Sequence, residues 1–212
     1  MPLPQVILCY GDSNTWGFRP DNKQRFDEDT RWPGVLRNEL DDSFRVLEEG
    51  LNGRTTVWDD PIEEHRNGKA YLMPCLLSHK PIDLDVMMLG TNDLKKRFSV
   101  SAFDIGRSIG VLLEIVARSA AGPGDAKPNT LVISPPPVGR LTEFTEMFEG
   151  AKEKSLALPK YYREHAGLQG CPFLDAGEVI QSSDFDGIHF EAAEHGKLGH
   201  AIAAKVRQIL AR

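Results

Sequence analysis

The stretch QVILCYGDSN, residues 5–14, indicates how this chain folds. Residues 5–10 are short, apolar and β-branched in part, which is typical of a strand buried on both faces. A glycine and two small polar residues, Gly11, Asp12 and Ser13, follow at once. The stretch therefore predicts a central strand of a parallel sheet, with a serine hydroxyl at its carboxyl end.

The rest of the chain repeats the alternation of strand and helix. Short apolar runs predict further strands at residues 44–48, 84–89, 130–134 and 172–175. Apolar residues at helical spacing predict helices at 32–40, 69–79, 101–120, 143–166 and 191–210. We expect Ser101 to cap a helix, Pro74 to kink one or delay its start, and Gly150 and Pro159 to interrupt another.

This alternation predicts an α/β protein with a three-layer α/β/α sandwich around a five-stranded parallel sheet. The 212 residues suit a single domain, 1–212. Hydrophobic residues make up 41% of the chain and charged residues 26%, and the net charge of −6 argues against nucleic acid as a partner.

Targeting and cysteine content carry little further information. The chain start shows no signal peptide, and no stretch reaches the ~20 apolar residues of a membrane span, so we expect a cytoplasmic protein without membrane contact. The cysteines Cys9, Cys75 and Cys171 are scattered and form no C-x-x-C pair. They indicate neither a disulfide framework nor a zinc site.

Residues that follow the predicted strands could support nucleophilic catalysis, because sites form at the carboxyl ends of parallel strands. Ser13 needs a base, and Asp186-Gly187-Ile188-His189 places a carboxylate and an imidazole in one turn before the last helix. Asp186 could then fix the tautomer of His189. Alternatively, Ser13 caps a helix or turn, and the loop before Glu191 is a helix cap.

An oxyanion hole needs donors aimed at the developing charge. The candidates are the backbone N–H groups of Ser13 and Gly53 and the side-chain amide of Asn92, all after predicted strands. Each also has a simpler interpretation, since Gly53 could be a turn glycine and Asn92 could form an Asx turn.

The order GDSN (11–14), Asn52-Gly53, GTND (90–93) and DGIH (186–189) resembles the SGNH hydrolases, or GDSL-type esterases. The resemblance spans nearly the whole chain and implies a flavodoxin-like fold. It implies Ser13 as nucleophile, His189 and Asp186 as base and orienting acid, and Ser13, Gly53 and Asn92 as oxyanion donors. Asn14 departs from the Leu of the family name, at a position that is not catalytic.

Longer runs look like the bacterial arylesterase and perhydrolase branch of this family: GDSNTWGF, RWPGVL, EEGLNGRTTVWDDP, MLGTNDLK, ISPPP and DGIHF. The branch resemblance implies hydrolysis of small aryl or short-chain acyl esters through an acyl-serine, acyl transfer to peroxide or alcohols, and no metal or organic cofactor. Two alternatives stay open. One is a carbohydrate O-deacetylase with the same triad, and the other is a non-catalytic flavodoxin-like protein that binds a small anion.

Large aromatic residues in or beside the predicted loops suggest contacts outside the core. Trp16 is a candidate substrate-binding residue, with Phe18 beside it. With Trp32 and Trp58, these side chains would be exposed in a monomer, so we expect a homo-oligomer, as the branch resemblance also implies. A metal role for Glu191, His195 and His200 is not favoured by their spacing, and residues 63–66 suggest a solvated turn.

Overall fold

The computed structural model describes residues 3–210, which form five parallel strands interleaved with helices. The strands are β1 (Gln5–Gly11), β2 (Phe44–Gly50), β3 (Leu84–Met88), β4 (Asn129–Ser134) and β5 (Phe173–Asp175). The helices are α1 (Ser13–Trp16), α2 (Trp32–Glu39), α3 (Gly68–His79), α4 (Ala102–Ala117), α5 (Ala151–Leu168) and α6 (Ala192–Leu210). Short 3-10 turns lie at Asn92–Leu94, Lys96–Phe98, Pro123–Asp125 and Ala176–Glu178.

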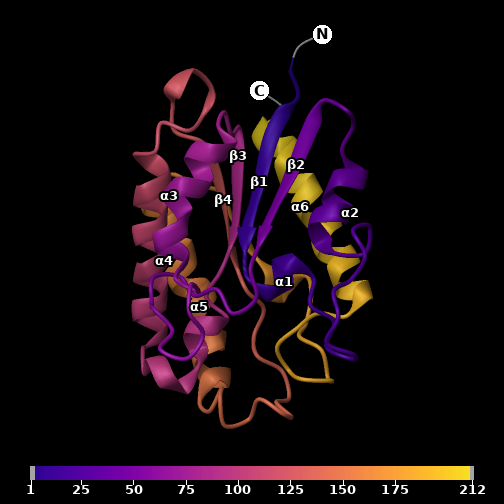
Figure 1. The fold of residues 1–212 in the computed structure, drawn as a ribbon, viewed down its shortest axis with the longest axis vertical. Helices are drawn as coiled ribbons and strands as arrows, with labels where there is room; N and C mark the ends of the chain where they lie inside the picture. The colour runs from indigo at the N-terminus through magenta and orange to yellow at the C-terminus, as the bar shows by residue number, and fades with distance from the viewer. Residues whose placement is uncertain (1–2, 211–212) are drawn as a thin grey trace.

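The sheet order is β2-β1-β3-β4-β5, and every pair is parallel. Helices α3, α4 and α5 cover one face of the sheet and α2 and α6 the other, which is the predicted three-layer sandwich (Figure 1). All strands point to the same edge, and α1 lies directly beyond it. The order matches the flavodoxin-like arrangement, whose sites form where the first and third strands diverge.

Strand β1 illustrates why these residues form a central strand. Ile7 and Cys9 face the α2–α6 layer, whereas Leu8 and Tyr10 face the α3–α4–α5 layer, and all four are fully buried. A strand covered on both faces needs a continuous apolar run, because either face would otherwise bury polar side chains.

Ser101 caps α4 as predicted, since its hydroxyl accepts from Asp104 N–H at 3.1 Å. The Asp104 carboxylate in turn accepts from Ser101 N–H at 3.3 Å, which completes a capping box.

The predicted helix at 143–166 is interrupted at Gly150 as expected, but its first part, before Gly150, is not an α-helix, and the expected interruption at Pro159 is wrong. Helix α5 begins only at Ala151, because Gly150 has a left-handed backbone (φ 73°) that ends the preceding turns. It then runs through Pro159 to Leu168. Close packing on α4 offsets the lost backbone hydrogen bond: a Cβ at Gly106 would lie 2.3 Å from that of Tyr161. Helix α3 likewise starts at Gly68 and continues through Pro74.

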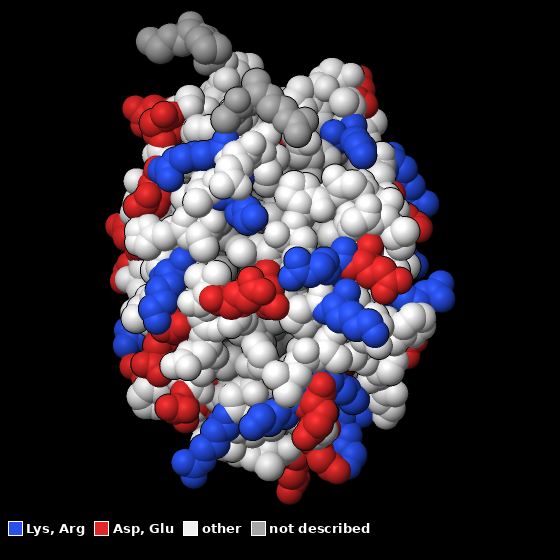
Figure 2. All heavy atoms as spheres, turned by 180° about the vertical axis from the view of Figure 1, so that it is seen from behind, with Lys and Arg blue, Asp and Glu red and all other residues white. Residues whose placement is uncertain are grey.

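The surface carries charges of both signs (Figure 2). Among the described residues on the face in Figure 2, acidic and basic side chains are interspersed and form no patch of one sign. Within residues 3–210, none of the helices combines the length and the apolarity needed to cross a lipid bilayer.

Asp85 is a carboxylate buried inside the apolar sheet. It lies in β3, fully buried, and neither carboxylate oxygen has a hydrogen-bond partner among the described residues. Burial raises its pKa to about 8. Since the unfolded chain ionises near its ordinary value of about 4, the folded state is penalised increasingly as pH rises from about 4 to 8.

We therefore expect Asp85→Asn to remove this penalty. The free energy of unfolding of the variant relative to the wild type should rise by on the order of 1 kcal/mol per pH unit across that window. Denaturant unfolding at a series of pH values measures it. Asp42→Asn, at an exposed aspartate, is the control. A difference that stays flat with pH would contradict the buried-acid interpretation.

Candidate active site

Ser13 is held at the carboxyl edge of the sheet by a short, well-anchored helix. Strand β1 ends at Gly11, and Asp12 caps α1 by accepting from Asn14 N–H at 2.9 Å. The cap is therefore Asp12, and the Ser13 hydroxyl is free of the capping role that we considered for it.

Ser13, His189 and Asp186 form a continuous chain of hydrogen bonds. His189 Nε2 lies 3.0 Å from Ser13 Oγ, although the two residues are 176 positions apart. His189 Nδ1 lies 2.6 Å from Asp186 Oδ2. All three residues are buried, with exposed fractions of 5%, 7% and 1%. The structure thus brings together Ser13, predicted at the end of the first strand, and Asp186 and His189, predicted from the turn before the last helix.

Asp186 is kept ionised although it is buried. Burial alone would raise its pKa, but the hydrogen bond and charge of His189 outweigh it. Backbone N–H groups of Ile188 and His189, which donate to Oδ1 at 2.8 and 2.9 Å, add to this effect. The net effect lowers the pKa of Asp186 below its usual value. An ionised partner fixes the Nδ1–H tautomer, so the unprotonated Nε2 is directed at the serine.

The imidazole is also enclosed by aromatic rings. Phe18 packs against His189 with the ring planes tilted by 34° and the centroids 4.2 Å apart, and Phe144 approaches edge-on at 6.2 Å. These contacts restrict rotation of the imidazole, so that it stays aligned with both partners.

The predicted oxyanion donors lie beside the serine. Asn92 donates through Nδ2 to Arg54 O at 3.1 Å, which ties the loop after β3 to the loop that carries Gly53. One amide hydrogen of Asn92 remains for another acceptor. Within residues 3–210, the backbone N–H groups of Ser13 and Gly53 have no protein acceptor. The arrangement therefore offers three donors that an oxyanion could use.

Ser13, Gly53, Asn92 and His189 line a cavity of about 180 Å³. Its apolar wall consists of Phe18, Phe144, Met147, Phe148 and Ile188. Its polar lining adds Asn52, Glu63 and Lys95. The cavity thus places an apolar wall beside the Ser13 hydroxyl and a set of N–H donors.

Two sequence-based expectations about this wall differ from the structure. Trp16 is not among the residues that line the cavity. It ends α1, and the Arg25 guanidinium lies over its ring at 4.9 Å. Phe18 lines the cavity instead. Glu63, expected in a solvated turn, also lines it and pairs with the buried Lys95 at 2.9 Å.

Sequence reasoning missed Phe144, Met147 and Phe148, because their spacing also describes one face of a helix. They lie in a turn-rich segment that hydrogen bonds to the loop of His189: Gly139 N–H donates to Gly187 O at 2.8 Å, and the Thr142 hydroxyl donates to Phe185 O at 2.7 Å.

Within residues 3–210, no group of three potential metal ligands lies at Ser13. His195 is buried and its Nδ1 faces the N–H of Trp32 at 3.3 Å, while His200 pairs with Glu39. In the described part of the chain, the one group of three potential ligands lies elsewhere.

Comparisons with known proteins agree with this geometry. The profile of the GDSL-like Lipase/Acylhydrolase family matches residues 9–197. The structure of the native M. smegmatis aryl esterase is 43% identical, with a TM-score of 0.93, and the match covers 97% of this chain and all (100%) of that one. Est24, a carbohydrate acetylesterase from Sinorhizobium meliloti, is 39% identical with a TM-score of 0.94, at 97% and 100% coverage.

A second Sinorhizobium meliloti structure, of a carbohydrate acetylesterase family member, is 37% identical with a TM-score of 0.93, covering 98% of this chain and 100% of that one. A search of curated proteins finds no match. The chain belongs to the GDSL-like lipase/acylhydrolase family. It is a carboxylic ester hydrolase with the SGNH-type fold.

The turn that presents His189 depends on Gly187. Its backbone is left-handed (φ 79°), and a Cβ would lie 2.6 Å from Arg140 O. Gly187→Ala should therefore reduce stability by about 1–3 kcal/mol and lower esterase activity by displacing Asp186 and His189. Gly170→Ala is the matched control, because Gly170 has φ 65° but nothing within 4 Å of the added Cβ. Equal activity in both variants would show that a Cβ at residue 187 does not displace the turn, despite its proximity to Arg140 O.

Proposed function

We propose that this protein is a serine esterase that cleaves small carboxylic esters through an acyl intermediate on Ser13. The proposal rests on the chain Ser13 Oγ–His189 Nε2–Asp186, with separations of 3.0 and 2.6 Å, at a small apolar cavity. A serine is a weak nucleophile alone, and this contact supplies the base it needs.

The reaction uses each group in turn. As Ser13 Oγ attacks the ester carbonyl, His189 Nε2 takes the hydroxyl proton and Asp186 stabilises the imidazolium. Ser13 N–H, Gly53 N–H and the Asn92 amide bind the oxyanion. Collapse expels the alcohol, which takes the proton from His189. Water then attacks the acyl-serine as His189 Nε2 takes its proton. His189 returns that proton to Ser13 Oγ when the carboxylic acid leaves.

The cavity argues for a short acyl group. Its volume of about 180 Å³ is well below the roughly 300–1,000 Å³ of drug-sized ligand pockets. Phe144, Met147 and Phe148 supply apolar contacts, so an acetyl or similar group would be held without unpaired polar atoms.

Carbohydrate O-deacetylation is the second candidate. Est24 is named a carbohydrate acetylesterase, and the cavity also has a polar side with Asn52, Glu63 and Lys95. The Lys95–Glu63 pair could accept and donate hydrogen bonds to sugar hydroxyls. Family membership and the Ser–His–Asp contacts favour either esterase over a non-catalytic anion-binding protein.

Acyl transfer and self-association extend the proposal. The small volume and apolar wall of the cavity would limit water near the acyl-serine, which would favour alcohols or peroxide as acceptors. The half-buried Trp16 and Trp58 support a homo-oligomer, whereas Trp32 does not, because it is fully buried in its own subunit. Light scattering of the purified protein tests the subunit number.

Ser13→Ala should abolish esterase turnover by roughly 10⁴-fold or more, because the base then has no nucleophile to activate. A fluorophosphonate probe followed by mass spectrometry should label Ser13 in the wild type and nothing in the variant. Ser78→Ala, at an exposed serine of α3, should retain full activity. A Ser13→Ala protein with a tenth of normal activity would refute the assignment.

Asn92→Ala should lower kcat by on the order of 10²–10³-fold, the usual cost of one oxyanion donor. KM should change little, because the contact strengthens only in the transition state. Steady-state kinetics with p-nitrophenyl acetate separates the two parameters, with the exposed Asn38→Ala as control. An effect on KM alone would mean that Asn92 binds ground-state substrate.

Substrate panels should distinguish the finer alternatives. We expect activity to fall steeply from acetyl to longer acyl esters, and a short added alcohol to divert the acetyl group from water. Initial rates with graded p-nitrophenyl esters and with an acetylated sugar measure both, with product analysis for transfer. Higher kcat/KM on the sugar favours the deacetylase, and hydrolysis that dominates at high alcohol concentration argues against restricted water access.

A further inference from the structure

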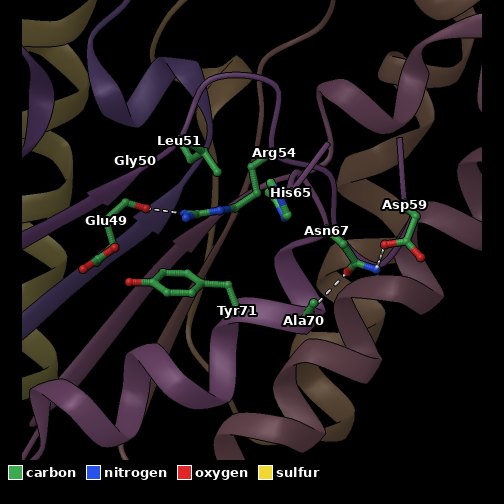
Figure 3. Close-up of a pocket in the computed structure, with 9 residues that line it drawn as sticks. All are labelled: Glu49, Gly50, Leu51, Arg54, Asp59, His65, Asn67, Ala70 and Tyr71. Atoms are coloured by element: carbon green, nitrogen blue, oxygen red, sulfur yellow. Dashed lines mark hydrogen bonds between the residues drawn. The ribbon is translucent and has the colours of Figure 1, made fainter. Parts of the chain in front are cut away.

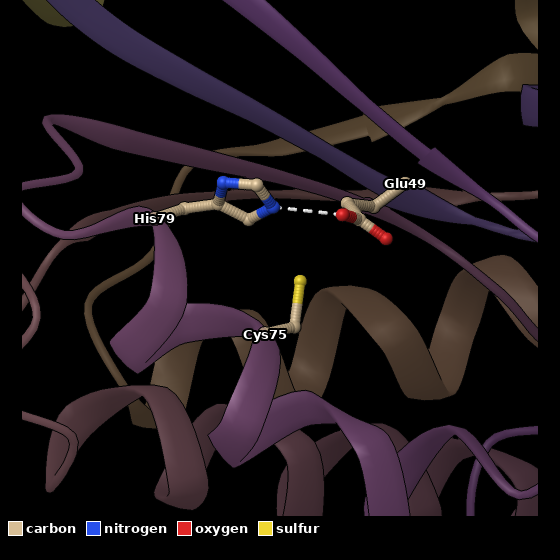
Figure 4. Close-up of side chains that lie close together, drawn as sticks. All are labelled: Glu49, Cys75 and His79. Atoms are coloured by element: carbon tan, nitrogen blue, oxygen red, sulfur yellow. Dashed lines mark hydrogen bonds and ion pairs between the residues drawn. The ribbon is translucent and has the colours of Figure 1, made fainter.

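Three side chains with metal-ligating atoms converge on the α3 side of the sheet, and none of them lines the cavity at Ser13. Glu49 comes from β2, and Cys75 and His79 come from α3. One ligand atom of each lies within 4.8 Å of the others. Figure 4 shows the Cys75 sulfur pointing into the space between the His79 ring and the Glu49 carboxylate.

Regular elements hold these groups in place. Cys75 and His79 are one helical turn apart, so both project from the same face of α3. Glu49 lies in the register of the sheet opposite Tyr10, and its backbone carbonyl accepts from the Arg54 guanidinium. Ligands on a strand and a helix are positioned more rigidly than ligands on loops, which favours a defined site.

A tetrahedral metal site would need small shifts of these ligand atoms, which lie within 4.8 Å of one another. His79 Nε2 lies 2.7 Å from Glu49 Oε1 in a hydrogen bond. Bond lengths of about 2.0–2.3 Å to zinc would need ligand atoms about 3.3–3.6 Å apart. The His79 and Glu49 side chains are 30% and 21% exposed, so they can separate slightly and admit an ion from solvent.

The buried thiol restricts the kind of cation. The three side chains offer one sulfur, one nitrogen and one oxygen atom. A cation that binds all three must have a high affinity for thiolate. Mg²⁺ and Ca²⁺ prefer oxygen ligands, whereas Zn²⁺, Co²⁺ and similar ions accept sulfur, nitrogen and oxygen together.

We propose that Glu49, Cys75 and His79 bind one thiophilic divalent cation of the Zn²⁺ type. On binding, the Cys75 S–H proton passes to solvent, His79 coordinates through Nε2 with its proton on Nδ1, and the Glu49–His79 hydrogen bond is replaced by two bonds to the metal. Water completes the tetrahedron. A cavity of about 550 Å³, lined in part by Glu49 and Tyr71, adjoins the site and gives it solvent access (Figure 3).

Such an ion would link the C-terminal end of α3 to β2, which lies at one edge of the sheet. A ligand that binds only the folded state stabilises it by mass action. The expected role is structural and is independent of the proposed ester chemistry.

Titration of the metal-free protein with Co²⁺ and Zn²⁺ tests the proposal. Co²⁺ should give a thiolate charge-transfer band and strong tetrahedral visible bands that saturate at one equivalent, and Zn²⁺ should displace it. Zn²⁺ should also raise the melting temperature of the full chain. Absence of the thiolate band at one equivalent would overturn the site.

Variants identify the ligands. Cys75→Ser should remove the charge-transfer band, and His79→Ala should weaken Zn²⁺ binding at least about 10–100-fold, since even loss of an outer partner has that effect. Cys171→Ser, at a half-buried cysteine outside the cluster, and His65→Ala, at an exposed histidine, should bind as the wild type does. Loss of the band in Cys171→Ser would mean that the metal binds Cys171 and not Cys75, which would refute the proposed site. If Cys75→Ser fails to fold, His79→Ala decides, and unchanged affinity there refutes the proposal.

Discussion

The pairing of β1 with β3 in the middle of a sheet buried on both faces is the constraint on which the site depends. Because all strands are parallel, their carboxyl ends meet at one edge. The chain leaves β1 for β2 on one side, while β3 lies on the other, so no crossover helix covers the point between them. Ser13 and Asn92 emerge at this point, and the loop after β2 brings Gly53 to them. The position of Ser13 is thus a property of the topology.

Two buried carboxylates hold the loops at this edge through hydrogen bonds, although burial disfavours their ionised form. Asp12 caps α1, and Asp93 accepts from Thr56 N–H at 3.1 Å and from its hydroxyl. Burial raises the pKa of each to about 6. Since their unfolded pKa values are lower, the stability that they contribute is lost as pH rises through about 6. Asp186 behaves oppositely: its lowered pKa makes its contribution disappear as pH falls.

The sequence predicted what local chemistry encodes. Apolar runs predicted all five strands, the small polar residues after them predicted where Ser13, Gly53 and Asn92 would meet, and the turn before the last helix predicted His189. Side-chain direction at the ends of elements was not predictable. Trp16 and Phe18 are close in sequence, yet only Phe18 lines the cavity. Trp32 was expected at the surface but packs in the core that α2 and α6 form on the sheet.

The least predictable part of the site is the wall formed by residues 142–150. Phe144, Met147 and Phe148 have helical spacing, so periodicity alone cannot separate a helix face from a folded loop. Only tertiary contacts decide, and these are the bonds Thr142–Phe185 and Gly139–Gly187. The same hydrogen bonds connect this wall of the cavity to the turn that carries His189. Substitutions in this wall should therefore change substrate size preference and base alignment together, so that specificity and turnover cannot vary independently here.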